Sequence, residues 1–476
     1  MFKKIINISI AFLLVILIGC AQVPKLDRTK APEVGQPKSI NFPKFEETTL
    51  SNGLNLIVVE NHKLPIVFIS LTFKGGSYYD GDKVGLSNLT STLQTKGTTN
   101  RTAMQIANEI DFLGSSLSSN SGWDDNSLTM RTLKKNLNQT FDVFLDCLFN
   151  PVFAEDELKR EVAQLYSELQ HSKTEPNYLA STQFAKTIFG DKHPYGKVTT
   201  EASLNSITTA DLKQFYAKYF VPNNAYCVVG GAISLKDAVA LLESKLKDWK
   251  KGAELPKDNV APKTPASTRN VVIVDKPEAV QSAVRVGNVS VTRLNPDYLK
   301  LSVLNVYLGG YFRSQLSQKL REEKSYTYGV SSGLAPRLFP GPFAVSTSVK
   351  SEVTASAIED ILDEINKLST TLIPEDRFNE VKNYVIGSFP MGIQTAVQVA
   401  GLLSNLKLYG LPMNYYDNYI SNIQKITRED LKNVAEKYMD ASKMSIVVSG
   451  DNKTVAPTLS KFGEVIIVDV DGNTIK

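Results

Sequence analysis

The sequence predicts an α+β fold with two homologous domains, each a mainly antiparallel sheet packed with helices. The first observation is a repeat, in which Ile207–Lys213 (ITTADLK) recurs as Ile426–Lys432 (ITREDLK), 219 residues later. The same offset relates two further pairs: Lys218–Tyr219 with Lys437–Tyr438, and Val228–Gly231 with Val447–Gly450. Three matches at one offset indicate a tandem duplication. The second observation is that strand patterns precede runs of helical periodicity in each copy, which favours helices layered on a sheet.

The elements follow the same order in the two halves. In the first half, apolar patterns predict strands at 54–60 and 66–73 and helices at 103–113, 133–148, 154–170 and 178–188. In the second half, they predict strands near 271–275 and 282–291 and helices near 298–308 and 312–323. In each repeat a threonine can cap the amphipathic helix that leads into a buried, valine-rich strand. The proline-containing segment between the halves is typical of a linker.

The composition excludes several classes of protein. The 476 residues contain 53 Lys and Arg against 49 Asp and Glu, a formal charge of +4. With 21% charged and 42% hydrophobic residues, the chain is not a disordered charged protein, and it has no sustained basic cluster for nucleic acid. Three cysteines are too few for a disulfide scaffold or a cysteine-rich metal site. Two of them, Cys147 and Cys227, are expected to be buried free thiols.

The N-terminus is typical of a bacterial lipoprotein. Lys3 and Lys4 precede an apolar run from 5 to 18 that is too short for a comfortable membrane span and is typical of a signal segment. The run ends in LIGC, which resembles a lipobox and predicts cleavage before Cys20 and acylation of its sulfur. The alternative is a plain signal peptide with an incidental cysteine. We expect a protein anchored to a membrane by lipid and facing the periplasm or the exterior.

Short motifs occur in the same order as in a known peptidase family. They are Gly85–Thr98, Phe149–Pro151, His193–Gly196 and Val221–Asn224, followed by Leu308–Gly310, Leu320–Glu322 and Ser325–Gly329. Together they resemble the pitrilysin/insulinase-like zinc metallopeptidases (inverzincins), which include the mitochondrial processing peptidase, over nearly the whole mature chain. The expected organisation is a signal peptide at 1–19, a tether at 20–43, a first peptidase-like domain at 44–250, a linker at 251–268 and a second such domain at 269–476.

The first family helix lacks its catalytic residues in this chain. The family carries H-x-x-E-H there, in which two histidines four apart bind one Zn²⁺ and the glutamate activates the bound water. The corresponding residues are Asn88, Ser91 and Thr92. Because Asn and Thr are poor substitutes for His, the sequence predicts a degenerate zinc site.

Other candidate ligands are few. By resemblance, Glu168 matches the third zinc ligand of the family and Glu161 its supporting carboxylate, and seven residues place both on one helix face. Without histidine partners a solvated acidic face is the plainer interpretation, and we interpret both residues as vestigial. His62, His171 and His193 do not pair at ligand spacing, so surface or hydrogen-bonded roles are expected. The sequence therefore predicts no metal and no other cofactor bound by this chain.

A second constellation is intact. By resemblance, Arg321 and Tyr328 match the arginine and tyrosine with which the zinc-free domain clamps the substrate backbone and stabilises the tetrahedral intermediate. Arginine supplies a fork of donors, and a tyrosine hydroxyl can donate to an oxyanion. We expect Arg321 to close a helix and 325–330 to form a strand, with the competing Tyr326 on the opposite strand face. The alternative is a helix-terminal arginine followed by ordinary strand tyrosines.

These observations predict the zinc-free subunit of a two-subunit peptidase outside the cytoplasm, inactive alone. A paralogue with H-x-x-E-H would supply the zinc, and this chain would supply Arg321 and Tyr328 in trans to a peptide substrate. The alternative is a non-enzymatic peptide-binding or scaffold homodimer of the same fold. A third hypothesis, a stand-alone peptidase, requires Asn88, Thr92 and Glu168 to hold zinc, and it leaves no general base in place of Ser91.

Overall fold

The computed structural model describes residues 28–29, 41–255 and 268–475. The predicted signal peptide, the predicted lipid-bearing Cys20 and residues 256–267 of the predicted linker lie outside these residues. Asn41–Lys476 form one unit, to which all the elements described below belong.

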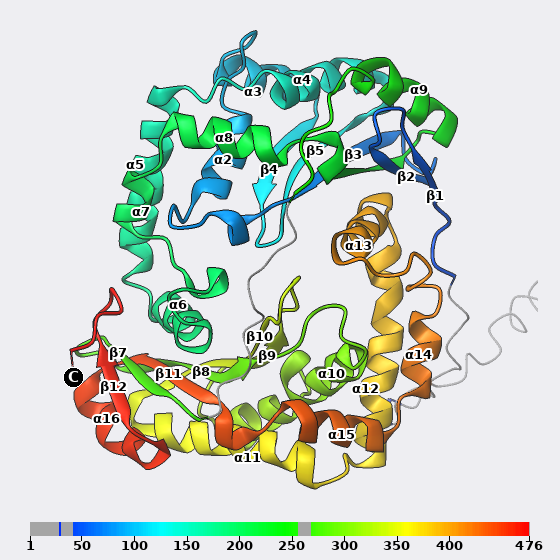
Figure 1. Cartoon of the computed structure of the whole chain (residues 1–476). Helices are drawn as coiled ribbons and strands as arrows, with labels where there is room; N and C mark the ends of the chain where they lie inside the picture. The colour runs from blue at the N-terminus through cyan, green and yellow to red at the C-terminus, as the bar shows by residue number, and fades with distance from the viewer. Residues whose placement is uncertain (1–27, 30–40, 256–267, 476) are drawn as a thin grey trace, which may run out of the picture. The chain divides into compact units, whose positions relative to one another are not determined.

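Two six-stranded sheets organise the chain, one in each half (Figure 1). The first has the order β1-β2-β6-β3-β5-β4 and the second β12-β7-β11-β8-β10-β9. The strands of the first sheet are β1 (Glu46–Thr49), β2 (Asn55–Glu60), β3 (Ile66–Lys74), β4 (Ser116–Ser121), β5 (Asp125–Leu133) and β6 (Ala225–Gly231). Those of the second are β7 (Val271–Asp275), β8 (Gln281–Val289), β9 (Val330–Leu334), β10 (Pro342–Lys350), β11 (Ser445–Gly450) and β12 (Val465–Val468).

The matching strand order confirms the predicted α+β fold with two homologous halves. In each sheet the inner pair β2–β6 or β7–β11 is parallel, and the next three strands are antiparallel. The first edge strands differ, because β1 is antiparallel to β2 whereas β12 is parallel to β7. Val228 in β6 lies opposite Ser70 of β3, and Val447, its equivalent in β11, lies opposite Arg285 of β8. Each half has an apolar core between its sheet and its helices.

Helices cover both sheets. Those of the first half are α2 (Leu86–Gln94), α3 (Ala103–Phe112), α4 (Leu137–Phe149), α5 (Glu155–Ser172), α6 (Pro176–Phe189), α7 (Glu201–Asn205), α8 (Thr209–Tyr219) and α9 (Leu235–Leu246). Those of the second are α10 (Tyr298–Asn305), α11 (Thr354–Thr370), α12 (Glu375–Ser388), α13 (Ala396–Tyr409), α14 (Tyr419–Lys425), α15 (Arg428–Tyr438) and α16 (Asn452–Leu459), with two π-helical segments, η5 (Val306–Gly310) and η6 (Ser317–Glu323).

Within the described part of the chain, no helix by itself has the length and apolarity needed to cross a membrane. Two consecutive helical segments, Glu375–Ile393 and Ala396–Tyr409, are together long and apolar enough, but the chain bends by 109° at the break between them.

The repeated threonine motif forms the same cap in both halves. Thr208 and Thr427 each precede a helix and accept a hydrogen bond from the backbone N–H three residues later. Those residues, Asp211 and Asp430, accept in return from the threonine N–H at 2.8 and 3.0 Å. Such a reciprocal cap satisfies two otherwise unpaired backbone donors. The prediction that a threonine starts this helix in each repeat is confirmed.

The two halves exchange one helix each. The first-half helix α6 packs on β8 and β11 of the second sheet, and the second-half helix α13 packs on β2, β3 and β6 of the first (Figure 1). A Cβ on Gly230 of β6 would lie 3.1 Å from the Cβ of Ala396 in α13, a tighter contact than most side chains make, so glycine suits this close approach. Each sheet is therefore covered partly by the other half.

Two predicted helices and one predicted strand are wrong in part. The helix at 133–148 begins at Leu137, because Asp125–Leu133 form β5, whose half-polar alternation pairs it between β3 and β4. The helix at 312–323 begins after a turn that follows Gly310, and its regular part is the π-helical η6. The strand at 325–330 begins only at Val330.

Candidate functional site

The helix α2, which carries the degenerate metal positions, is held at its start by a buried carboxylate. Gly85 adopts a φ of 106°, a left-handed conformation that suits glycine. The Asp80 carboxylate accepts hydrogen bonds from the backbone N–H groups of Gly85 and Ser87, both at 2.8 Å. Burial raises the pKa of Asp80 to about 6, against the opposing effect of these two bonds. The first turn of α2 is thereby tied to the preceding loop.

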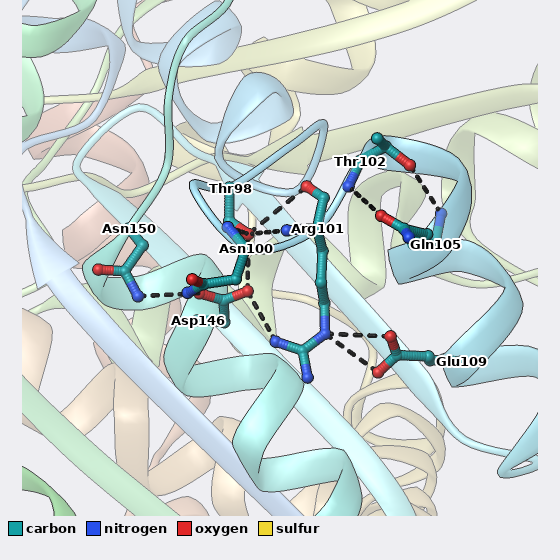
Figure 2. Close-up of polar contacts among 8 residues, drawn as sticks. All are labelled: Thr98, Asn100, Arg101, Thr102, Gln105, Glu109, Asp146 and Asn150. Atoms are coloured by element: carbon teal, nitrogen blue, oxygen red, sulfur yellow. Dashed lines mark hydrogen bonds and ion pairs between the residues drawn. The ribbon is translucent and has the colours of Figure 1, made fainter.

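The segment after α2 is fixed by a buried network on α4 (Figure 2). Asp146 accepts hydrogen bonds from Thr98 Oγ1 and Asn100 Nδ2, both at 2.6 Å. It also accepts from Arg101 Nη1 at 2.7 Å and Asn150 Nδ2 at 2.8 Å. Burial alone would raise the pKa of Asp146, but these donors outweigh it and hold the pKa below its usual value. The network joins Thr98 and Asn150, which come from two separate motifs of the resemblance.

The three degenerate positions of α2 have different surroundings. Asn88 is exposed and Thr92 is half-buried. Ser91 is buried, and its hydroxyl donates to Asn126 Oδ1 of β5 at 3.0 Å. The same oxygen accepts from Ser87 Oγ at 2.8 Å. The position that carries the family's general base is thus committed to a structural hydrogen bond.

The two acids of α5 do not form one solvated face. Glu161 is buried, and its Oε1 lies 2.9 Å from Arg160 Nη2 and 3.5 Å from Lys96 Nζ. Glu168 is exposed and accepts from Gln164 Nε2 at 2.9 Å. The prediction of a solvated face is therefore wrong for Glu161, because two cations neighbouring it make its burial tolerable.

Arg321 and Tyr328 line one cavity of about 800 Å³ in the second half. Arg321 lies in the last turn of η6, where its guanidinium stacks 4.7 Å from the ring centre of Phe312 and its Nε is 3.6 Å from Glu322 Oε1. The Tyr328 side chain is 98% exposed, so its hydroxyl is free for a ligand. The remaining lining residues come from α6, β8, η6, β10 and the segment before β9: Asn177, Gln281, Arg285, Glu322, Ser325, Tyr326, Thr327, Gly329 and Ser346–Lys350.

The segment between η6 and β9 is an irregular loop, contrary to the predicted strand. Ser325 has a φ of 52°, and Thr327 Oγ1 both accepts from the N–H of Gly329 and donates to its carbonyl. These local bonds compete with strand pairing. Tyr326 is half-buried against the core of the second half, whereas Tyr328 projects outward.

Two family models match most of the chain that the structure describes. One, described as insulinase (peptidase family M16), matches residues 56–198, and the other, described as the peptidase M16 inactive domain, matches residues 206–385. Together they cover more than half of the sequence, and the fold agrees with them. The chain belongs to the insulinase (M16) family. The first match contains the degenerate helix α2, and the second contains Arg321 and Tyr328.

Relatives of similar length carry mixed descriptions. An uncharacterized zinc protease of Rickettsia felis is 25% identical over 85% of this chain and 97% of its own length. The non-peptidase homolog YmxG of Helicobacter pylori is 24% identical over 84% and 92%. Among solved structures, a peptidase M16 inactive domain from Pseudomonas fluorescens matches with a TM-score of 0.80 and 25% identity, covering 86% of this chain and 98% of that one. A protease from Helicobacter pylori matches with a TM-score of 0.79 and 20% identity, covering 86% and 100%.

The zinc of the M16 family does not fit the residues of α2 and α5. Within residues 41–255 and 268–475, no group of three or more His, Cys, Asp or Glu side chains could hold a metal ion. Asn88 lines a separate cavity of about 320 Å³ with Leu165 of α5, but that cavity includes neither Glu161 nor Glu168. A structural zinc site has four Cys, His or carboxylate ligands, and a catalytic site has three such ligands and a water. The amide of Asn88 and the hydroxyls of Ser91 and Thr92 are therefore unsuitable ligands for zinc.

The histidines of this M16 chain have no shared site. His62 is exposed and lies 2.7 Å from Glu60 Oε1. His171 is exposed on α5, and His193 is buried, where its Nδ1 accepts from the Tyr195 N–H at 3.1 Å. The predicted surface and hydrogen-bonded roles agree with these surroundings. The thiols of Cys147 and Cys227 are free and buried, as predicted.

A contact between the halves was not predicted from the sequence. Arg337, in the loop from β9 to β10, stacks 4.1 Å from the Trp123 ring and 4.2 Å from the Tyr195 ring, both in the first half. Tyr195 Oη donates to Asp124 Oδ1 at 2.7 Å, and the Leu338 N–H donates to Asp124 Oδ2 at 3.1 Å. Only the motif around residues 193–196 hinted at this cluster, because its other members come from separate loops.

The basic residue Arg285 in the Arg321–Tyr328 cavity was also missed. The available signal was that Arg285 is the single charged residue of strand β8, whose sequence is QSAVRVGNV. Isolated charges of this kind are common where a strand has one partly exposed face, so the pattern alone did not distinguish Arg285.

Proposed function

We propose that this M16 protein is the zinc-free subunit of a two-subunit peptidase, anchored outside the cytoplasm by a lipid on Cys20. The observation that carries the proposal is the contrast between α2, whose donor set does not suit zinc, and the intact cavity that contains Arg321 and Tyr328. A paralogous partner with H-x-x-E-H would hold the zinc and the general base. This chain would bind the peptide substrate.

The side chains of Arg321 and Tyr328 suit substrate binding in trans. The guanidinium of Arg321 offers a rigid fork of donors for backbone carbonyl groups. The hydroxyl of Tyr328 is exposed enough to donate to oxygen charge that develops on the scissile carbonyl. Neither group needs a metal in this chain to do so. The cavity that Arg321 and Tyr328 line has a volume of about 800 Å³, enough for several residues of an extended peptide.

The first experiment is a native pull-down of the tagged, full-length protein from its source membranes. A near-equimolar relative with H-x-x-E-H supports the two-subunit peptidase. The second compares Arg321→Ala with Arg313→Ala in the purified complex, since Arg313 is an exposed arginine outside the cavity that pairs with Glu380 at 3.2 Å. We expect Arg321→Ala to lower kcat by about 10²- to 10³-fold, and Arg313→Ala to leave it unchanged.

Assembly serves as the control for this comparison. Both variants should co-elute with the partner in size-exclusion chromatography, because the contacts of Arg321 are with Phe312 and Glu322 of its own half. Unchanged turnover in Arg321→Ala, or loss of the complex, would contradict a substrate-binding role. Tyr328→Phe, which removes only the hydroxyl, should lower turnover without altering assembly.

A non-enzymatic role is the second candidate, and the relative described as a non-peptidase homolog favours it. In that case the protein would be a peptide-binding or scaffold homodimer and would need no zinc-bearing partner. Recovery of only this chain in the pull-down would support the second candidate over the first.

A further inference from the structure

The cavity of Arg321 and Tyr328 contains a second arginine with an unusual set of partners. Arg285 reaches it from β8 and is held by neutral acceptors of α6 and its own strand. Its Nη2 donates to Asn177 Oδ1 at 3.1 Å, and its Nε and Nη2 donate to Ser181 Oγ at 3.2 and 3.0 Å. Its Nη1 donates to the carbonyl of Val284 at 2.9 Å.

These contacts orient the guanidinium without neutralising it. No carboxylate within the described ranges forms an ion pair with Arg285, although a partly buried arginine is usually paired. Burial lowers the pKa of its guanidinium, and no acidic group acts in the opposite direction. Nη1 carries two N–H groups and has one protein acceptor, so one donor is left for a ligand.

The charge of the whole cavity is also unbalanced. Its lining includes the cations Arg285, Arg321 and Lys350, and the single acid Glu322, which is already beside Arg321. The first turn of α6, represented in the lining by Asn177, adds the partial positive charge of a helix N-terminus. A ligand that brings one carboxylate would therefore complete the electrostatics of the cavity.

We infer that Arg285 forms a carboxylate subsite in this cavity, and that the chain prefers peptides that present a carboxylate near the segment bound by Arg321 and Tyr328. The inference rests on the proposed function in that the ligand is a peptide. The carboxylate comes either from an acidic side chain or from the C-terminus of the peptide. Arginine suits it because its planar fork matches the two oxygens of a carboxylate.

The test measures peptide binding to the isolated full-length chain by fluorescence anisotropy, without the partner. The probes are a short serine–alanine peptide labelled at its amino end, made with a free C-terminal carboxylate, with an amidated C-terminus, and amidated with one central glutamate. We expect at least one carboxylate-bearing probe to bind about 10-fold or more tightly than the neutral probe. The probe that gains affinity identifies the source of the carboxylate.

Two variants separate a specific subsite from general attraction. Arg285→Gln should abolish the preference for the carboxylate, whereas Lys350→Gln, which removes an exposed cation from the same cavity, should reduce it by less than about 3-fold. Circular dichroism checks that both variants are folded. If Arg285→Gln does not fold, the wild-type probes still test the carboxylate preference, and Arg285→Lys, which keeps the charge but loses the planar fork, tests whether Arg285 is its source.

Three outcomes would overturn the subsite: equal binding of all probes, no measurable binding, or equal losses in the two variants. None of them bears on the two-subunit proposal, which the turnover of the Arg321→Ala complex tests separately. Conversely, failure to find a zinc-bearing partner would leave the carboxylate preference of the isolated chain intact.

Discussion

The Asp146 network makes the sharpest stability prediction. Asp146→Asn removes the negative charge of a carboxylate that is almost wholly buried. That carboxylate accepts hydrogen bonds of 2.6–2.8 Å from the side chains of Thr98, Asn100, Arg101 and Asn150. Breaking a buried ion pair costs about 3–5 kcal/mol, and the asparagine keeps one acceptor, so we expect a loss in that range. At about 2.1 cal/mol/K per residue over the roughly 435 residues of the unit, this lowers Tm by about 3–6 °C.

The matched control lies on the same helix. Asp142 is 54% exposed and pairs with Lys245 at 3.0 Å, so Asp142→Asn should cost less than about 1 kcal/mol. Thermal unfolding followed by circular dichroism at pH 7 compares the variants. If Asp146→Asn unfolds within about 1 °C of Asp142→Asn, the network does not stabilise the fold as described.

The pH dependence gives an independent check. Because the pKa of Asp146 is lowered in the folded protein, its stabilising effect is fully present above the unfolded pKa of about 4. It is lost as the pH falls through the lower, folded value. The difference in Tm between wild type and Asp146→Asn should therefore stay constant from pH 8 to 5 and shrink below pH 4.

Two more predictions follow from the site and the contact between the halves. The purified full-length chain should contain far less than one zinc per molecule by elemental analysis, and EDTA should leave its Tm unchanged; stoichiometric zinc would show that the donor set has been misjudged. Arg337→Ala should increase amide hydrogen exchange around Trp123 and Tyr195, because two cation–π contacts of about 0.5–2 kcal/mol each are lost. Arg293→Ala, which removes an arginine stacked on two tyrosines within the second half, should leave exchange in the first half unchanged.

Local and repeated features were predictable from the sequence. The caps at Thr208 and Thr427 and the buried strands β6 and β11 followed from short motifs whose structure depends on nearby residues. The strands β1, β4, β5, β10 and β12 were missed, and β9 was placed too early, because edge and half-polar strands are stabilised by pairing within the sheet rather than by a continuous apolar pattern. The loop before β9 was mistaken for a strand, because the Thr327 hydroxyl bonds the backbone of Gly329 in place of a strand partner. The residue types alone do not show this bond.

The candidate site was predictable in part for a similar reason. The motifs located Asn88, Ser91, Thr92, Arg321 and Tyr328, and the structure gives each a surrounding. The residues that surround them are distant in sequence. Asn126 of β5 accepts a hydrogen bond from Ser91 of α2, and Arg285 reaches the Arg321 cavity from β8. No pattern within a short window could reveal either pairing.

The exchange of α6 and α13 determines when the chain can finish folding. Synthesis completes β6 about 180 residues before it completes α13, a delay of roughly 10–35 s at usual ribosome speeds. Until then, the strand face at Gly230 has no cover, and the N-terminal half lacks part of its packing. A product truncated in this interval would expose apolar strands and aggregate.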